Sequence, residues 1–341
     1  MIKRRKFNKK RQNSRYSKLS LFQRPDTKFF KPCPFSEKNA PTINYKNIAK
    51  GISIFAVGLF KKLVIADTFS VWATTGFDNA VVLTFVEAWA TSASFSFQLY
   101  FDFSGYSDMA VGLGLLFNIN LINNFNSPYK ATGIINFWAR WHITLTRFIT
   151  TYIYTPIIRS FGSINFSNSM LATFLAMMIA GLWHGPAWTF VVFGGMHGLA
   201  LVINHIWKKN KFPCAKLLGW FFTMNFVNVS FVVFRAKEWE DAIKVLKGML
   251  GLNGVVISNS LLKLLPNLSG YGFLVGNHLK NLQANDDVFR MIIVSIVVVI
   301  FFKNSNDFVN TFKMNWPTLI FISLISIISI LSLTKISPFL Y

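Results

Sequence analysis

A stretch of 48 residues from Ser160 to Trp207 contains no Lys, Arg, Asp or Glu, and it dominates the hydropathy pattern of the chain. At about 1.5 Å per residue, one helix of this length would reach roughly 70 Å, more than twice a hydrocarbon core of about 30 Å. The stretch must therefore break. Gly185-Pro186 predicts the place, because proline lacks the amide hydrogen of a helix and clashes with the preceding turn. His184 directly precedes this break, and two further histidines, His197 and His205, follow it.

Apolar runs elsewhere predict further membrane segments. The expected spans cover Gly51–Ala66, Val81–Phe101, Met109–Phe117, Ile134–Ile158, Leu217–Phe234, Val288–Phe302 and Trp316–Leu333. Together with the charge-free stretch they predict an all-α, polytopic membrane protein with eight or nine membrane segments, some of them re-entrant. Arg235–Lys247 predicts a surface amphipathic helix, and the Asn-rich run Asn118–Asn126 predicts a loop or re-entrant turn. Lys61 and Lys62 are expected near an interface, because two cations at mid-span are costly.

Composition supports the membrane class. Hydrophobic residues make up 52% of the 341 residues and charged residues only 14%, whereas soluble domains carry about 25% charged residues. Cys33 and Cys214 are the two cysteines of the chain. They have no metal-binding or redox spacing and are too few for a disulfide framework, so they do not indicate a compartment.

The positive charge is concentrated near the N-terminus. Residues 1–50 hold 15 Lys or Arg against Asp26 and Glu37, so +13 of the net +22 lies there. A basic run beside apolar spans is typical of a segment that faces the cytoplasm or the lipid headgroups. No nucleic-acid-binding pattern accompanies it, and we expect no nucleic-acid partner. We predict a poorly ordered basic arm over residues 1–48 and a transmembrane domain in the lipid bilayer over residues 49–341.

Ionisable side chains inside membrane spans are costly, so they are candidates for function. His184 is the first candidate, because imidazole takes and returns a proton near neutral pH. The Gly-Pro break beside it also frees backbone groups, which are tolerated at membrane depth only inside protein or along a cavity. The structural alternative is a neutral histidine bonded to a backbone carbonyl in a packed kink. The pattern favours function.

His142 is the second candidate. On a helix it would share a face with Trp138, four residues earlier, and Arg140 would share a face with Arg147. A Trp-His-Arg cluster fits a functional site and an interfacial belt equally well. The two arginines could hold a phosphate or carboxylate, although headgroup contacts are the commoner use.

Asp102 is the third candidate. It lies six residues before Asp108, so the two carboxylates do not share a helical face. Asp102 could orient a histidine or arginine of another helix, or it could lie at a water-filled re-entrant loop. The sequence contains no metal-ligand spacing, G-x-S-x-G motif, P-loop or dinucleotide fingerprint.

These residues are compatible with more than one chemistry. A membrane-embedded histidine without a nucleophilic serine or cysteine motif suits one-step acyl transfer, in which the base takes a proton from an acceptor hydroxyl while a thioester donor arrives from the other side. The same buried groups also suit a transporter with a proton relay and no acyltransferase activity. The residues alone leave both open.

Four motifs, in this order, resemble a known family. They are Gly58-Leu-Phe-Lys-Lys-Leu-Val-Ile-Ala-Asp67, Tyr100-Phe-Asp-Phe-Ser-Gly-Tyr-Ser-Asp-Met-Ala110, Phe137-Trp-Ala-Arg-Trp-His-Ile-Thr-Leu145 and Gly181-Leu-Trp-His-Gly185. They are similar to motifs of the membrane-bound O-acyltransferase (MBOAT) family, above all its bacterial alginate O-acetylation branch. The resemblance covers about Gly51–His205.

The resemblance implies a fold and a set of roles. The expected fold is a ring of tilted helices around a thin partition, with a tunnel from a cytoplasmic donor to an external acceptor. His184 matches the family's catalytic histidine, His142 matches the supporting tunnel histidine, and Asp102 matches the motif aspartate. The expected donor is acetyl-CoA or another acyl thioester, with no bound cofactor and no metal. The expected setting is the inner or plasma membrane, with an extracytoplasmic acetyltransferase partner and a polysaccharide acceptor such as alginate or another exopolysaccharide.

Two departures from the family pattern stand out. After the Trp-His-Ile motif, Thr150-Thr-Tyr152 and Ile157–Gly162 replace the family's usual sequences, which bears on partner and polymer specificity. Relatives also carry several helices before the Gly-Leu-Phe-Lys-Lys motif, where this chain has only the basic arm. We therefore expect an N-terminally truncated version of the fold, with an inactive fragment as one further possibility.

Overall fold

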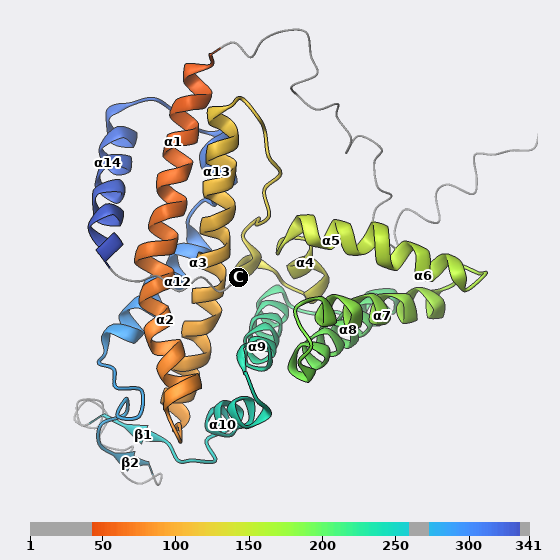
Figure 1. Ribbon diagram of the computed structural model, residues 1–341. Coiled ribbons are helices and arrows are strands. Elements are labelled where there is room, and N and C mark those ends of the chain that lie inside the picture. Colours follow the sequence, from red (N-terminus) through yellow and green to blue (C-terminus); the bar gives the residue numbers. More distant parts are fainter. Residues whose placement is uncertain (1–42, 259–272, 335–341) are drawn as a thin grey trace, which may run out of the picture.

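The computed structural model describes residues 43–258 and 273–334, and within them the chain is almost entirely helical (Figure 1). This confirms the all-α prediction. The α-helices are Tyr45–Phe60 (α1), Asp67–Thr74 (α2), Phe85–Leu116 (α3), Ile134–Trp138 (α4), Ile143–Ile149 (α5), Thr155–Ser160 (α6), Phe166–Trp183 (α7), Trp188–Lys209 (α8), Lys216–Arg235 (α9), Trp239–Met249 (α10), Asp287–Phe301 (α12), Ser305–Asn310 (α13) and Trp316–Leu331 (α14). Nearly all of the predicted basic arm lies outside the described residues.

Short elements complete the chain. π-Helical turns cover Lys61–Ala66, Thr75–Asn79 and Thr150–Tyr154, and 3₁₀ turns cover Pro128–Lys130 and Ser332–Thr334. Two parallel strands of two residues each, Val256–Ile257 (β1) and Leu274–Val275 (β2), pair between α10 and α12. They are too short to alter the helical class.

An antiparallel pair of long helical segments forms one side of the molecule (Figure 1). One member runs from α1 through α2 without interruption, and the other is α3. A Cβ atom added to Gly58 would lie 2.5 Å from the carbonyl oxygen of Gly105, and one added to Gly112 would lie 2.7 Å from that of Gly51. Only glycine allows two helix backbones to approach so closely. The spacing of seven residues on both helices therefore sets how α1 and α3 pack.

Two ion pairs lie in the same interface. The Nζ atom of Lys61 is 2.6 Å from Asp108, and that of Lys62 is 2.8 Å from Asp102. Lys62 also lies 3.1 Å from Asp67, and its side chain is only 3% exposed. The expectation that the two lysines lie near a membrane interface stays a prediction, while the structure shows that Lys62 is buried within the protein. The carboxylates of α3 provide the counter-charge that the α1 sequence alone could not reveal.

α3 joins two predicted spans into one helix. It continues from Phe85 to Leu116, across the expected gap between Val81–Phe101 and Met109–Phe117. Thr84 and Glu87 form a capping box at its start, where the Glu87 carboxylate accepts the Thr84 backbone N–H at 2.9 Å. The polar residues in the middle of α3 are buried against protein, so they do not end the helix.

The segment predicted as one helix over Ile134–Ile158 is broken, and that prediction is wrong. α4 ends at Trp138, and α5 begins only at Ile143. The Asn-rich run supplies the competing hydrogen bonds: the backbone N–H of Ile143 donates to Asn124 O at 3.0 Å, and that of Asn126 donates to Arg140 O at 2.9 Å. Because the helix does not continue, the predicted shared helix faces in this segment do not form.

α7 and α8 form a helical hairpin whose bend falls where the charge-free stretch was predicted to break. α7 ends at Trp183, and α8 begins at Trp188. The helices touch near this bend, because a Cβ on Gly181 would lie 2.2 Å from Phe190 O. The prediction of a break at Gly185-Pro186 is confirmed.

Three helices of the described residues are long and apolar enough to cross a membrane by length and composition, namely α7, α8 and α9. α9 forms where the span at Leu217–Phe234 was predicted, and its length and apolar composition fit that prediction. α14 is apolar but has only 16 residues, or about 24 Å. The predicted total of eight or nine spans therefore exceeds what these criteria support. α10 matches the predicted surface helix and starts with a capping box of Glu238 and Asp241.

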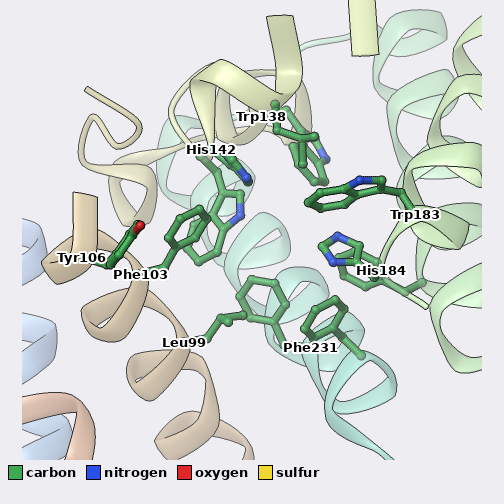
Figure 2. A pocket seen from close by; sticks show the side chains of 12 residues that line it. Leu99, Phe103, Tyr106, Trp138, His142, Trp183, His184 and Phe231 are labelled. Atoms are coloured by element: carbon green, nitrogen blue, oxygen red, sulfur yellow. The ribbon is translucent and has the colours of Figure 1, made fainter. Parts of the chain in front are cut away.

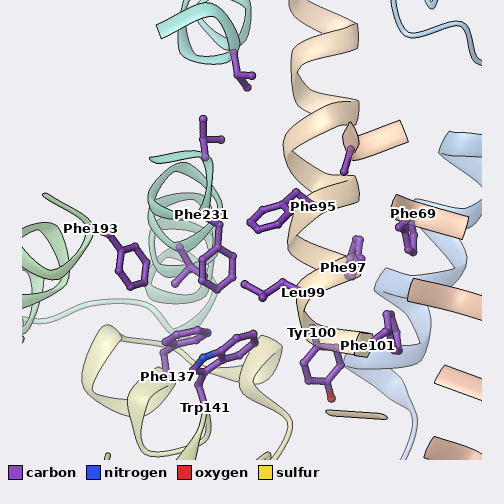
Figure 3. Close-up of a cluster of buried hydrophobic side chains, with 14 of the residues drawn as sticks. Phe69, Phe95, Phe97, Leu99, Tyr100, Phe101, Phe137, Trp141, Phe193 and Phe231 are labelled. Carbon is purple, nitrogen blue, oxygen red and sulfur yellow. The ribbon is translucent and has the colours of Figure 1, made fainter. Parts of the chain in front are cut away.

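The main core lies between α3 and the elements α4, α8 and α9, and it is largely aromatic (Figure 3). Phe137 stacks on Trp141 with ring centroids 5.5 Å apart, and Phe95 meets Phe231 edge to face at 6.5 Å. Such geometries add about 0.5–1.5 kcal/mol per pair beyond simple burial. This core places α3, α4 and α9 around a cavity.

Candidate functional site

A cavity of about 350 Å³ lies where the α4–α5 break, the α7–α8 bend, α3 and α9 meet (Figure 2). It is mostly aromatic. Its lining residues are Leu99, Phe103, Tyr106, Trp138, Trp141, His142, Leu145, Trp183, His184, Phe193, Phe231 and Phe234. Both predicted histidines therefore reach one pocket although 42 residues separate them in the sequence. Figure 2 shows their rings turned toward the same space, with Trp138 and Trp183 beside them.

His184 caps the C-terminus of α7 at the bend. Aromatic rings surround it: Trp183 lies 4.9 Å away between centroids, and Phe234 meets it edge to face at 5.0 Å. No other described residue forms a hydrogen bond with either ring nitrogen of His184. The described residues therefore do not show the structural alternative, in which His184 would bond to a backbone carbonyl. The imidazole faces the pocket with its nitrogens available to a substrate.

His142 reaches the pocket from the α4–α5 break. It has φ 43° and ψ 57°, the left-handed conformation that is uncommon for a residue with a Cβ. Its ring meets Phe103 edge to face at 4.6 Å. Its Nδ1 atom is buried, and no partner for it lies among the described residues. Sparsely populated backbone conformations of this kind persist where surrounding contacts hold them, and they concentrate at functional sites.

Asp102 lies apart from the two histidines. It is not among the residues that line the pocket. Its carboxylate, with a side chain only 3% exposed, faces Lys62 across the α1–α3 interface. Its neighbours Leu99 and Phe103 do line the pocket. α3 therefore presents apolar side chains to the site and its carboxylate to the opposite helix.

Sequence reasoning did not identify most of the pocket wall. Tyr106, Phe193, Phe231 and Phe234 line it, but aromatic residues are so frequent in this chain that their positions give no distinct signal. The one available signal was the Trp-His pairing in both histidine motifs, since Trp141 and Trp183 each directly precede a pocket histidine. Within the described ranges, no three His, Cys, Asp or Glu side chains gather as metal ligands would.

Fold and pocket together define a helical membrane protein with two histidines in an apolar cavity. The family model of the membrane-bound O-acyltransferases (MBOAT) matches residues 21–235. This chain belongs to that family. The family resemblance inferred from the four motifs is thereby confirmed.

Individual relatives cover different parts of the chain. It is 46% identical over 290 residues to the peptidoglycan O-acetyltransferase of Helicobacter pylori, covering 83% of this chain and 54% of that protein. It is 37% identical over 215 residues to the Pseudomonas aeruginosa protein named "Probable alginate O-acetylase AlgI", covering 62% and 40%. It is 31% identical over 163 residues to the teichoic acid D-alanyltransferase of Streptococcus thermophilus, covering 41% and 39%. The chain thus spans about half or less of the length of these curated relatives.

Proposed function

We propose that this protein is an O-acyltransferase that transfers an acetyl group from an acyl thioester, such as acetyl-CoA, to a hydroxyl of a cell-envelope polysaccharide. The convergence of His142 and His184 on one apolar cavity carries the proposal. Membership of the family supports it, and so do relatives that are named for O-acetylation. The reaction needs a proton acceptor in a site from which bulk water is kept, so that thioester hydrolysis does not compete.

His184 is the general base of the proposed reaction. Its free ring nitrogen takes the proton of the acceptor hydroxyl as the oxygen attacks the thioester carbonyl carbon. The tetrahedral intermediate then collapses, the carbon–sulfur bond breaks, and the proton passes from His184 to the departing thiolate. The products are an ester and a free thiol, so no covalent acyl-enzyme is needed.

His142 and Asp102 have different supporting roles. The His142 imidazole, which lines the pocket, is the group best placed to contact the reacting carbonyl or hydroxyl and to hold it against His184. Asp102 supports the site indirectly: paired with Lys62, it fixes the α3 segment that brings Leu99 and Phe103 to the pocket. In this assignment His142 contacts substrate, whereas Asp102 is a positioning residue.

Peptidoglycan is the acceptor we favour over alginate. The relative named for peptidoglycan aligns over more of the chain and at higher identity than the relative named for alginate. A polymer outside the membrane also requires passage of the acyl group across it, so we place the protein in the inner or plasma membrane as a multi-pass protein with an extracytoplasmic acetyltransferase partner. The α7, α8 and α9 helices are long and apolar enough to cross a membrane, which supports this placement.

Acetyl-ester analysis of the envelope polymers tests the proposal. Cells with and without the gene are compared, and His184→Ala is compared with His205→Ala, a second histidine of the charge-free stretch that does not line the pocket. We expect loss of the gene or of His184 to abolish esters on peptidoglycan, while His205→Ala retains them and both variants accumulate normally. Normal acetylation in His184→Ala would contradict the catalytic assignment. Substrate flux without any ester formation would instead indicate a transporter.

A further inference from the structure

His197 lies on α8, one layer behind the wall of the pocket. Its side chain is fully buried, with 0% exposure. Four aromatic rings enclose it: Phe193 at 4.6 Å, Trp138 at 5.1 Å, Phe226 at 5.2 Å and Phe137 at 6.5 Å between centroids. A polar ring in such surroundings is tolerated only if its nitrogens have hydrogen-bond partners. The partners of the two nitrogens therefore show which side chains His197 keeps in place.

Both nitrogens of His197 are engaged, and the partners fix the direction of each hydrogen bond. The indole N–H of Trp138 donates to His197 Nδ1 at 3.2 Å. Because an indole has no acceptor, Nδ1 carries no hydrogen and the neutral ring must carry it on Nε2. Nε2 lies 2.9 Å from the Ser230 hydroxyl, which in turn donates to the carbonyl of Val227 at 2.8 Å.

The result is a one-way chain of hydrogen bonds across three helices. It runs from Trp138 at the end of α4, through His197 on α8, to Ser230 and the α9 backbone. Trp138 is the first link, and it lines the pocket beside His142 (Figure 2). Phe193, which packs on the His197 ring, lines the pocket too. His197 thus contacts two walls of the pocket without facing the pocket itself.

We infer that His197 is a positioning residue that holds the Trp138 indole as a fixed wall and thereby limits the acyl group to a short one. A tryptophan side chain without this bond has other rotamers open to it, and a wall that moves admits longer chains. The inference rests on the proposed acyl transfer. It adds a determinant of acyl length, and it assigns a role to a histidine that takes no part in the chemistry.

The hydrogen-bond chain is tested first, without any measurement of activity. ¹⁵N-histidine NMR of the full chain in detergent yields signals from five histidines, and His197→Asn identifies the His197 signal by its loss. We expect unprotonated Nδ1 and protonated Nε2 in the wild type. Trp138→Phe should shift the Nδ1 signal. A ring protonated on Nδ1, or one whose signal ignores Trp138→Phe, would overturn the inference.

Acyl selectivity provides the second test. Membranes that contain each variant receive equal amounts of acetyl-CoA and butyryl-CoA, and the ratio of the two esters is measured, because general loss of folded protein lowers both esters alike. We expect His197→Leu and Trp138→Phe each to lower the acetyl-to-butyryl ratio at least about fivefold, and the double variant to lower it no further. His197→Asn should recover part of the ratio, since its Oδ1 atom can accept from the indole.

A matched pair of hydroxyl deletions on α9 completes the design. Ser230 and Thr223 are both buried and both donate to a carbonyl of their own helix, but only Ser230 also bonds His197. We expect Ser230→Ala to lower the ratio and Thr223→Val to leave it unchanged. An unchanged ratio in His197→Leu, or an equal change in Thr223→Val, would refute the positioning role. Absence of any acyl transfer by the wild type would contradict the proposed function and with it the limit on acyl length, while the NMR test still decides whether His197 holds Trp138.

Discussion

The α1–α3 interface and the histidine pocket both hold polar groups in an apolar protein. The groups at the interface are paired with one another, whereas a polar atom of the pocket has no partner among the described residues. At the interface Lys61 lies 2.6 Å from Asp108, and the Ser305 hydroxyl of α13 donates to the same carboxylate at 2.5 Å. In the pocket His142 Nδ1 has no partner among the described residues. The two regions share α3, whose carboxylates face one and whose apolar side chains face the other.

This difference separates structural polar groups from candidate reactive ones. A buried group that is fully paired gives rigidity, and removing one partner leaves an uncompensated charge. A buried group without a protein partner costs stability unless a substrate or water completes it. His197 belongs with the first kind even though its neighbours belong to the pocket. Substitutions of the two kinds of group should therefore differ in whether they lower stability or activity.

The largest effect is expected at Lys62. Lys62→Met removes the cation between Asp102 and Asp67, and we expect it to lower the free energy of unfolding by about 3–5 kcal/mol, because one partner of a buried pair is lost. Asp102→Asn should cost less, since Lys62 then keeps Asp67 at 3.1 Å. The thermal midpoint of the detergent-solubilised protein is the measurement. Equal midpoints for the two variants would show that the Lys62–Asp67 contact adds no stability once the Asp102 pair is lost.

The second effect concerns the pocket and should appear in rate rather than stability. His142→Ala removes the buried ring nitrogen, and we expect acyl transfer to fall about 100-fold, as when one preorganised polar contact to a reacting group is lost. The thermal midpoint should change little, because loss of an unpartnered buried nitrogen offsets the lost packing of the ring on Phe103. Ester formation per folded protein is measured. A large fall in the midpoint with unaltered specific activity would place His142 with the structural groups instead.

A smaller effect is expected from the glycine contacts of the α1–α3 pair. In Gly58→Ala the new methyl group would meet the Gly105 carbonyl at 2.5 Å, so the helices must separate, at a cost of about 1–3 kcal/mol. Gly195→Ala on α8 is the control, because its methyl group would meet only the flexible side chain of Met178 at 3.1 Å. Denaturation of both variants should show a lower free energy of unfolding for Gly58→Ala and an unchanged one for Gly195→Ala. Equal stability would mean that the α1–α3 backbones can move apart freely.

The smallest effect is expected at the exposed pair of Arg290 and Asp287. The two groups lie 2.8 Å apart, but their side chains are 76% and 51% exposed. Solvent screens such a pair, so Arg290→Ala should change the free energy of unfolding by no more than about 1 kcal/mol. The free energies of unfolding of Arg290→Ala and Lys62→Met are measured in the same denaturation experiment and compared. A cost near that of Lys62→Met would show that burial is not what distinguishes the two ion pairs.

Local sequence determined the features that depend on neighbouring residues. The Gly185-Pro186 break and the placement of His184 beside it follow from the missing amide hydrogen of proline, and no distant contact is needed. α9 and the amphipathic α10 follow in the same way from apolar length and from the capping pair Glu238 and Asp241. The helical class follows from apolar runs that must bond their own backbone in lipid.

Tertiary structure decided the features that depend on partners far along the chain. The α4–α5 break, which turns His142 into the pocket, exists because Asn124 and Asn126 take up hydrogen bonds that a continuous helix would have used. Lys62 is buried because Asp102, forty residues later, lies opposite it. His197 gained a role only when folding placed Trp138 and Ser230 on either side of its ring. A sequence names these groups, but only the fold determines which of them pair and which remain open to a substrate.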